Sequence, residues 1–379
     1  MEFGLNEEQT ILRNETRRFL SNECPIDAVK EIVGGEKGYS PSLWKKMAEL
    51  GWMGLLFEEK YGGIGGTFYD LAIILEEIGR FLVPGPFFST VILGGVTIMK
   101  GGNEELKQTL LHRIATGDVI VTLALTEMGG SYAAGEIEFK GELRLDSFLL
   151  NGKKMFVPHA HIADYIICSA EIHSKNDFNG ISLLLINARS KGILITPLVS
   201  LDLQKQFEVD FTGVNVPRNN LIGEGGGGRI LFQDLWPIAV AAKCCEMLGG
   251  MERVFEITLD YAQKRHQFGR PLSAFQVIQH YCADMAIELE CSRFLTHQAA
   301  WSVSKGLSSR KEVAMAKAWS SDVFKRITKV AHQIHGAIGF TKEHDLYLYF
   351  RSAKVGEITL GDATFHKEVV AREMDLGEA

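Results

Sequence analysis

Two arginines and a phenylalanine in the segment RHQFGRP, residues 265–271, have side chains that suit a nucleotide-type ligand. An arginine guanidinium is a planar fork of N–H donors that matches phosphate oxygens, so Arg265 and Arg270 are candidate phosphate ligands. Phe268 lies between them and offers a flat ring against which a base can lie. Charges and an aromatic ring at a helix junction are also common without any ligand, so this group alone does not establish a nucleotide site.

A second group lies in the segment AHQIHGAIGF, residues 331–340. Gln333 offers both a donor and an acceptor, and the small residues Gly336 and Ala337 let a ligand approach the main chain closely. His332 and His335 have no acidic or cysteine partner at metal-ligand spacing. We therefore predict that both histidines are core or hydrogen-bonding residues, and we predict no metal site.

A carboxylate near the end of the chain, Asp362, allows two interpretations. It lies in GDATFHKEVV with His366 one helical turn later, and a buried carboxylate of raised pKa can act as a general base. Aspartate after a glycine is also a favoured helix N-cap, and the capped N–H groups lower its pKa. The cap interpretation is the stronger of the two.

Helices and strands must position these candidate ligand and base residues. The first third of the chain is predicted to be helical. Asn6, Ser40 and Thr67 are each placed as the N-cap of a helix, and Gln9 stands at the capping-box position of the first. Beyond Asp118 the pattern becomes β-like, and residues 119–218 are expected to form an antiparallel β domain.

Two local signals refine that β domain. Phe207, Val209 and Phe211 alternate as in a half-buried strand, and Asn151–Gly152 predicts a hairpin turn. Helical segments are expected again near 230–265, 271–305, 310–335 and from about 363. The predicted domains are a helical domain over 1–118, a β domain over 119–222 and a helical bundle over 223–379.

This order of elements disfavours a parallel dinucleotide-binding sheet, because helices and strands do not alternate. The segment GEGGGG, residues 223–228, formally satisfies a glycine-rich dinucleotide pattern. It lacks the flanking strand–helix–strand context, so it is interpreted as a linker.

The composition is that of a globular protein, with 46% hydrophobic and 23% charged residues among 379. A net charge of −7 argues against nonspecific binding of nucleic acid. No apolar run reaches membrane-spanning length, and the first ten residues do not have the pattern of a secretory signal. The six cysteines show no metal-type pair, so we expect reduced thiols and a cytoplasmic protein.

The two C-terminal groups together resemble the acyl-CoA dehydrogenase family. The segments LNEEQTILRNETRRFL, GWMGLLFEEKYGGIGG, LALTEMGGS and LLNGKKMFVPHAHIADYIICSA also occur in the order found in that family, so the resemblance covers essentially the whole chain. It implies a mainly α fold with an N-terminal helical domain, a central antiparallel β domain and a C-terminal four-helix bundle. It further implies noncovalently bound FAD, an acyl-CoA substrate, transfer of electrons to an electron-transfer flavoprotein, and usually a homotetramer.

The resemblance also assigns FAD contacts to particular residues. Arg265, Gln267 and Phe268 are expected to reach the FAD of a neighbouring subunit, and Gln333, Gly336 and Ala337 to line its pyrophosphate. The remaining expected contacts, near the flavin ring and the phosphates, are Thr126, Ser131 and Phe156. Thr126 and Ser131 lie in a TEMGGS segment one residue shorter than usual, and Phe156 replaces the common tryptophan.

The family's catalytic positions are altered in this chain. Most members carry a glutamate that takes the α-proton of the acyl group, and its position here is Leu360. A minority carry that base on the first bundle helix, where this chain has Leu235. Pro158 replaces a threonine that usually bonds the flavin, and proline lacks that donor. Asp362 is the remaining candidate base, while Asp234 is expected to lie on a solvated helix face.

Three functions therefore stay open. The leading one is α,β-dehydrogenation of an acyl-CoA with Asp362 as base. The second is a noncatalytic role, in which the chain completes the FAD site of a mixed tetramer with a homologous subunit. The third is a different flavin reaction on a CoA thioester, in which Arg80 binds an anionic group of the substrate, although Arg80 also suits a helix C-terminus.

Overall fold

The computed structural model describes residues 4–130, 137–173 and 179–376. The chain forms two compact units, each described here by itself. The first comprises Met1–Lys30, Phe68–Val83 and Val240–Ala379, and the second comprises Glu31–Thr67 and Pro84–Ala239. Two helices, α2 (Ile26–Gly34) and α7 (Gly228–Lys264), contribute to both units.

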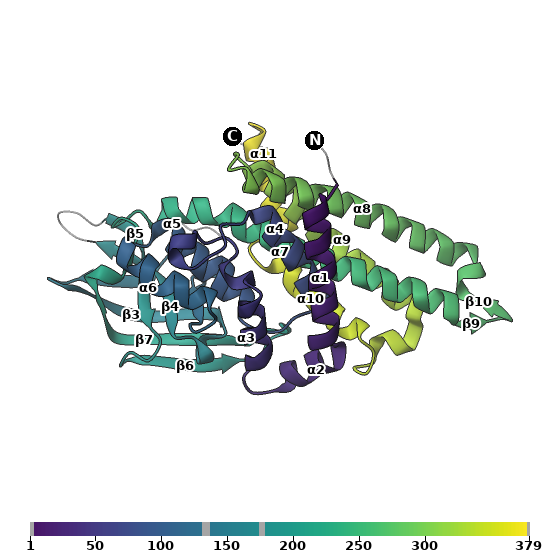
Figure 1. Cartoon of the computed structure of the whole chain (residues 1–379), viewed down its shortest axis with the longest axis horizontal. Coiled ribbons are helices and arrows are strands. Elements are labelled where there is room, and N and C mark those ends of the chain that lie inside the picture. The colour runs from purple at the N-terminus through teal and green to yellow at the C-terminus, as the bar shows by residue number, and fades with distance from the viewer. Residues whose placement is uncertain (1–3, 131–136, 174–178, 377–379) are drawn as a thin grey trace. The chain divides into compact units, whose positions relative to one another are not determined.

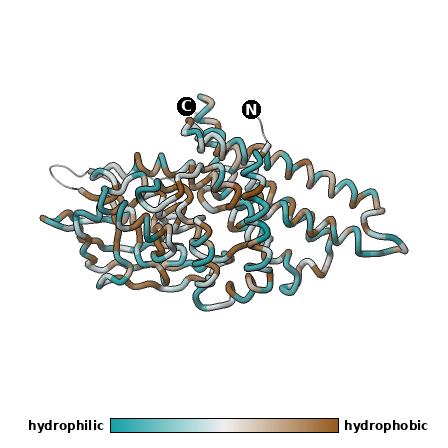
Figure 2. Tube along the Cα trace, in the orientation of Figure 1, coloured by the Kyte–Doolittle hydropathy of each residue, from teal (hydrophilic) through white to brown (hydrophobic). Residues whose placement is uncertain are grey.

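The first unit is helical (Figure 1). Besides its share of α2 and α7, its elements are α1 (Glu7–Glu23), α4 (Phe68–Arg80), the short strands β9 (His266–Gln267) and β10 (Arg270–Pro271), the 3-10 turn η6 (Leu272–Ala274), α8 (Gln276–Ser304), α9 (Arg310–His335), the 3-10 turn η7 (Gly336–Phe340), α10 (Leu346–Ile358) and α11 (Ala363–Glu373). In Figure 2, hydrophobic and hydrophilic residues alternate along the long helices, as expected for helices that bury one face. No described helix is both long and apolar enough to cross a membrane.

Helix starts follow the local sequence signals. The Asn6 side chain accepts from Gln9 N at 2.8 Å while the Gln9 side chain accepts from Asn6 N, so the predicted capping box is confirmed. Ser40 Oγ accepts from Leu43 N and Pro41 is the first helical residue of α3 (Pro41–Glu49), as predicted. The sequence did not predict α10, which precedes the closing helix.

Helices α4 and α7 touch through their main chains. A Cβ atom built on Gly79 would lie 1.8 Å from the Glu246 carbonyl oxygen, and one on Gly249 would lie 1.7 Å from that of Glu76. Both distances are far below a van der Waals contact. The two glycines are therefore required for this helix crossing.

The second unit combines helices with one large sheet (Figure 1). Its helices and turns are α3, η1 (Trp52–Gly54), η2 (Glu59–Tyr61), the π-helical η3 (Phe88–Gly95), α5 (Val96–Gly101), α6 (Glu104–Ala115), η4 (Ala160–Ile162) and η5 (Arg218–Asn220). Its strands are β1 (Val121–Ala124), β2 (Lys140–Leu143), β3 (Ser147–Pro158), β4 (Tyr165–His173), β5 (Asn179–Asn187), β6 (Ile193–Leu198), β7 (Gln206–Pro217) and β8 (Leu221–Ile222).

The sheet order is β6-β7-β3-β2-β4-β5-β8, with β1 paired to β4. The β6–β7, β7–β3, β3–β2, β4–β5 and β5–β8 pairs are antiparallel. The predicted fold class is thus confirmed, with one feature that periodicity did not predict: β1 and β2 both run parallel to β4.

The predicted hairpin turn at Asn151–Gly152 is wrong. Both residues lie inside β3, where the register to β7 shifts between Leu150 and Asn151. Gly152 has φ 137°, and Asn151 Oδ1 accepts from Gly213 N of β7 at 2.8 Å. The asparagine–glycine pair therefore continues a long strand, and the extra residue of the bulge is Gly213 of β7, which has φ 63°.

The glycine-rich segment 223–228 is tied to its neighbours. Gly223 N donates to Gly101 O at 2.6 Å, Gly226 N donates to Ser182 Oγ at 3.0 Å, and Gly228 begins α7. It thus joins the sheet to the first long helix, as the interpretation as a linker predicts.

All six cysteines are free thiols. Cys24, Cys168, Cys244 and Cys245 are buried, and Cys291 on α8 is exposed. Burial raises the pKa of the Cys168 and Cys244 thiols to about 12, so they stay protonated at neutral pH.

Candidate functional site

In the second unit, the chain brings Thr126 and Phe156 together. Thr126 follows β1, and its carbonyl accepts a hydrogen bond from Met155 N at 2.8 Å, next to Phe156 on β3. Phe156 has φ 51° and 55% of its surface is exposed, so its ring is free to contact a ligand. Ser131 lies outside the described residues.

A buried lysine anchors this loop. Lys154 on β3 has no exposed surface, and its Nζ donates to Glu127 Oε1 at 2.5 Å, Ser169 Oγ at 3.0 Å and Leu125 O at 3.3 Å. The Glu127 carboxylate also accepts from Glu138 N at 2.7 Å and from Phe139 N. The loop that carries Thr126 is thus bonded to Lys154 of β3 and to the main chain at Glu138 and Phe139.

In the first unit, Arg265, Gln267 and Phe268 form the tip between α7 and α8. The antiparallel pair β9–β10 closes this tip, and all three side chains are exposed, Phe268 by 91%. Among the described residues, no carboxylate pairs with the Arg265 guanidinium. Arg270 instead stacks on Phe275, with its guanidinium carbon 4.2 Å from the ring centroid.

The residues Gln333, Gly336 and Ala337 lie where α9 passes into η7. Gln333 and Ala337 are exposed, and a Cβ on Gly336 would meet no atom within 4 Å. The Tyr261 ring near the end of α7 stacks on His335 at 4.3 Å between centroids. This contact brings the end of α9 close to the α7–α8 tip, so the two groups of predicted phosphate ligands are neighbours.

The two histidines of this segment serve α9 itself. His332 Nδ1 donates to Thr328 O at 2.7 Å, and His335 Nδ1 donates to Ala331 O at 2.8 Å. Their predicted hydrogen-bonding role is confirmed. Within the described part of the chain, no three His, Cys, Asp or Glu residues are grouped so as to hold a metal ion.

Asp362 lies at the start of α11, and its Oδ1 accepts from Phe365 N at 2.8 Å. The predicted N-cap is confirmed. The turn before it carries Leu360 with φ 60° and Gly361 with φ 98°. The Gly361 carbonyl binds Lys317 of α9, and Lys317 lies eighteen residues before His335, about 27 Å along the helix axis. Within one chain, Asp362 is therefore remote from the Gln333 group.

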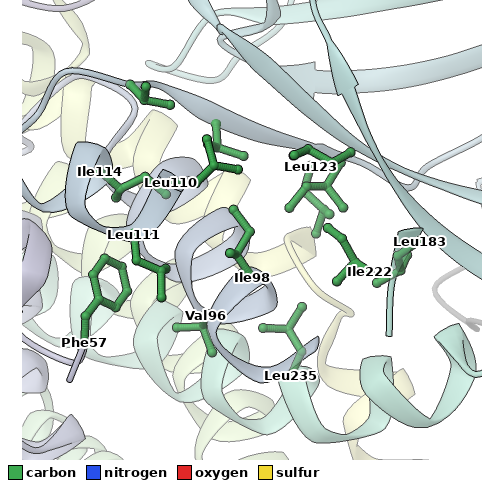
Figure 3. Packing of buried hydrophobic residues seen from close by; sticks show 14 of the residues in the cluster. Phe57, Val96, Ile98, Leu110, Leu111, Ile114, Leu123, Leu183, Ile222 and Leu235 are labelled. Atoms are coloured by element: carbon green, nitrogen blue, oxygen red, sulfur yellow. The ribbon is translucent and has the colours of Figure 1, made fainter. Parts of the chain in front are cut away.

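The position on α7 where a minority of the family carries its base is occupied by a leucine with apolar neighbours. Leu235 on α7 is 1% exposed and belongs to a hydrophobic core that includes Val96, Ile98 and Ile222 (Figure 3). Its neighbour Asp234 is exposed, as predicted for a solvated helix face. Neither residue provides a buried carboxylate at this position.

Arg80 is committed to carboxylates of its own unit. It is the last residue of α4 and is buried, and its guanidinium pairs with Glu252 at 3.3 Å and with Glu256. These ion pairs favour the helix-terminal interpretation of Arg80 over binding of a substrate anion.

Sequence reasoning missed two buried lysines, Lys154 and Lys317. A detectable signal existed for Lys317, because it falls on the same helical face as Val313, Phe324 and Thr328, all buried on α9. A lysine on an inward-facing stripe requires polar partners, since an unpaired buried ammonium is costly.

Models of all three acyl-CoA dehydrogenase domains match the chain in order: the N-terminal domain over residues 6–118, the middle domain over 122–214 and the C-terminal domain over 240–374. The chain belongs to the acyl-CoA dehydrogenase family. It is thus one of the oxidoreductases that act on CH–CH bonds, and its cofactor is FAD.

Individual acyl-CoA dehydrogenase relatives are similar over their whole length. The chain is 33% identical to the probable acyl-CoA dehydrogenase YngJ of Bacillus subtilis, covering 99% of this chain and 100% of the relative. The structure of butyryl-CoA dehydrogenase from Megasphaera elsdenii matches with a TM-score of 0.91 at 26% identity, covering 99% and 100%. A chain of the ChsE4–ChsE5 complex from Mycobacterium tuberculosis matches with a TM-score of 0.90 at 25% identity, covering 100% of this chain and 100% of that chain.

The residues of this acyl-CoA dehydrogenase chain fit FAD. Phe156 and Phe268 are exposed rings of the kind that contact flat ring systems. No carboxylate among the described residues pairs with the Arg265 guanidinium. A Cβ on Gly269 or Gly336 would meet no atom within 4 Å, so phosphates can approach the main chain there. These features suit a molecule with planar rings and a pyrophosphate.

Proposed function

We propose that this chain oxidises a saturated acyl-CoA to the 2,3-enoyl-CoA and passes the electrons to an electron-transfer flavoprotein, with Asp362 as the base. The observation that carries the proposal is the position of Asp362. It is a half-buried carboxylate two residues from Leu360, on the turn where most members of the family carry their base.

In the proposed reaction, the acyl α-carbon loses a proton to the Asp362 carboxylate. The α,β double bond forms as the β-carbon loses a hydride, and bound FAD supplies the hydride acceptor. Asp362 Oδ1 is used by the cap, while Oδ2 has no hydrogen-bond partner in the described part of the chain. One oxygen is thus available to take the proton.

We further propose that Thr126 and Phe156 bind FAD in one subunit, together with Ser131. Arg265, Gln267, Phe268, Gln333, Gly336 and Ala337 would bind the FAD of a neighbouring subunit. The distance of about 27 Å along α9 supports this division, because it separates the Gln333 group from the turn that carries Asp362. A homotetramer is the expected assembly.

The deciding experiment is an anaerobic titration of the purified protein with a panel of acyl-CoAs, following the flavin absorbance. The matched variant is Asp362→Asn, because asparagine caps a helix as well as aspartate and removes only the basic carboxylate. We expect flavin reduction to slow at least about 100-fold, the range for loss of a general base, without loss of stability. Asp234→Asn, on the exposed face of α7, is the control and should reduce at the wild-type rate.

Flavin reduction at full rate in Asp362→Asn would rule out Asp362 as the base. An alternative function is a noncatalytic partner subunit, and the apolar surroundings of Leu235 together with the capping role of Asp362 favour it. The match to a complex of two different chains shows a precedent for mixed assembly. If the chain alone is inert towards all acyl-CoAs but active when co-expressed with a homologue, this alternative is supported.

A further inference from the structure

A lysine in the interior of the helical unit binds the main chain of the turn between α10 and α11. Lys317 on α9 has no exposed surface. Its Nζ donates to Gly361 O at 2.7 Å, Ser321 Oγ at 2.9 Å and Glu357 O at 3.2 Å. An ammonium group has three N–H donors, so these three acceptors satisfy it completely.

These partners are neutral, which distinguishes Lys317 from an ordinary ion-paired lysine. In the described part of the chain, no carboxylate lies within 4 Å of its Nζ. Burial accordingly lowers its pKa to about 8. Keeping a lysine here at this energetic cost points to a demand for its three directed hydrogen bonds.

The turn that Lys317 binds has an unfavourable backbone. Leu360 has φ 60° and is followed by Gly361 with φ 98°. A residue other than glycine in the left-handed region costs about 1–2 kcal/mol, so this conformation needs support from its surroundings. A Cβ on Gly361 would lie 2.5 Å from the Phe365 ring and 2.9 Å from His366 Nε2, which leaves no room for another residue.

A second buried side chain supports the same turn. His366 on α11 is 2% exposed, and its Nε2 donates to Leu360 O at 2.8 Å. Lys317 from α9 and His366 from α11 thus hold the two consecutive carbonyls of Leu360 and Gly361 from different helices. The residue that follows directly is Asp362.

We propose that Lys317 is a positioning residue, which fixes the α10–α11 turn and thereby sets the place of Leu360 and Asp362 relative to the acyl-CoA. This inference rests on the proposed function for its catalytic consequence. Its structural part, control of the turn by Lys317, can be tested without any turnover.

The matched pair of variants is Lys317→Met and Lys325→Met. Methionine keeps most of the side-chain volume but leaves the Gly361 carbonyl without its lysine donor and the Glu357 carbonyl with only the Ser321 hydroxyl. Lys325 lies two turns further along α9 and binds the Glu357 side chain at 2.6 Å. In the described part of the chain, Lys325 makes no hydrogen bond to the main chain of the turn. Its side chain is 40% exposed, so it controls for loss of a lysine on this helix.

The first measurement is hydrogen–deuterium exchange at the amides of Phe365 and His366. Both amides are bonded to Asp362, to its side chain and to its carbonyl respectively. In Lys317→Met we expect these amides to exchange at least tenfold faster than in the wild type, with no change in Lys325→Met. Equal exchange in both variants and the wild type would overturn the inference.

The second measurement is the limiting rate of flavin reduction by acyl-CoA. We expect Lys317→Met to lower this rate at least tenfold while the apparent Kd for acyl-CoA and the affinity for FAD change less than threefold. Reduction at the wild-type rate alongside faster exchange would overturn the catalytic part of the inference. If the wild-type protein is reduced by no acyl-CoA, the proposed function fails, and exchange alone decides the role of Lys317.

Ser321→Ala provides the test if Lys317→Met does not fold. It removes one acceptor of the ammonium and a hydroxyl that also bonds Glu357 O at 3.3 Å, but leaves the lysine in place. We expect an intermediate rise in exchange at the same two amides. No rise in Ser321→Ala would contradict the proposed network.

Discussion

Replacing Glu127 by glutamine should destabilise the sheet unit and weaken FAD binding together. The substitution removes the only carboxylate that the structure places at ion-pair distance from Lys154 among the described residues, at 2.5 Å. Lys154 has no exposed surface, so its charge cannot be solvated by water instead. The same carboxylate accepts from the main-chain N–H groups of Glu138 and Phe139.

The magnitude follows from these contacts. Removing one member of a buried ion pair costs about 3–5 kcal/mol. Glutamine keeps one oxygen acceptor, and the Glu127 side chain is 14% exposed, so the lower end applies. We expect a loss of about 3 kcal/mol in the free energy of unfolding, measured by urea denaturation. Because Lys154 also holds Leu125 O next to Thr126, FAD affinity should fall at least about tenfold.

Two comparisons make this reasoning refutable. Glu142→Gln on β2 alters a carboxylate that is 67% exposed and 3.8 Å from Arg144, so its unfolding free energy should stay within about 0.5 kcal/mol of the wild type. The double variant Glu127→Gln/Lys154→Met removes the stranded charge, so it should be more stable than Glu127→Gln alone. If Glu127→Gln behaves like Glu142→Gln, or if the double variant loses the sum of both single effects, the buried pair does not hold the loop.

Two further predictions concern stability. Gly249→Ala should cost about 3 kcal/mol or more in unfolding free energy, because its Cβ would meet the Glu76 carbonyl at 1.7 Å, whereas Gly34→Ala, with nothing within 4 Å, should be neutral or stabilising. Urea denaturation of both variants checks this, and a neutral Gly249→Ala would contradict the close helix contact. Burial lowers the pKa of His159 to about 4, below its unfolded value of about 6.5, so the unfolded chain binds more protons and this group's stabilisation is lost as pH falls from 6.5 towards 4. Burial raises the pKa of Glu76 to about 8, so between pH 4.5 and 8 the folded chain binds more protons than the unfolded chain. The stabilisation from protonated Glu76 is therefore lost as pH rises from 4.5 through 8. The urea midpoint should fall less steeply at acid pH in His159→Asn than in the wild type, and less steeply at alkaline pH in Glu76→Gln. A pH dependence equal to that of the wild type in either variant would refute the role given to that residue.

Features set by hydrogen bonds between residues close in sequence could be predicted from the chain alone. The caps at Asn6, Ser40 and Asp362 each bond an amide three residues later, so the signal and its partner lie in one short window. The order of helical and β segments followed from periodicity for the same reason.

Features set by partners remote in sequence were missed or mistaken. Asn151–Gly152 stays inside β3 because β7 pairs with β3 on both sides of the bulge at Gly213. A turn signal carries no information about a strand some sixty residues later. The parallel pairing of β1 and β2 with β4 depends on the whole sheet. Lys317 bonds the carbonyls of Glu357 and Gly361, which lie forty or more positions later. The only sequence signal for a buried lysine with main-chain partners was therefore its place on the inward face of α9.

The FAD contacts stay predictions drawn from family resemblance. Phe268 and Gln333 would be unremarkable surface residues without it, since nothing in an exposed side chain alone names its ligand. The structure adds their grouping at neighbouring ends of α7 and α9 and the separation of Asp362 from them.

The buried thiols give the chain its own reporters of local opening. Cys168 lies in the sheet unit, and Cys244 and Cys245 lie in the helical unit, all shielded from reagents in the folded protein. Alkylation of each thiol, followed by peptide mass spectrometry, can therefore time the opening of each unit separately, with exposed Cys291 as the internal reference for reagent activity. A comparison of FAD-loaded and FAD-depleted protein would then show which unit the cofactor protects, without introducing any label by mutation.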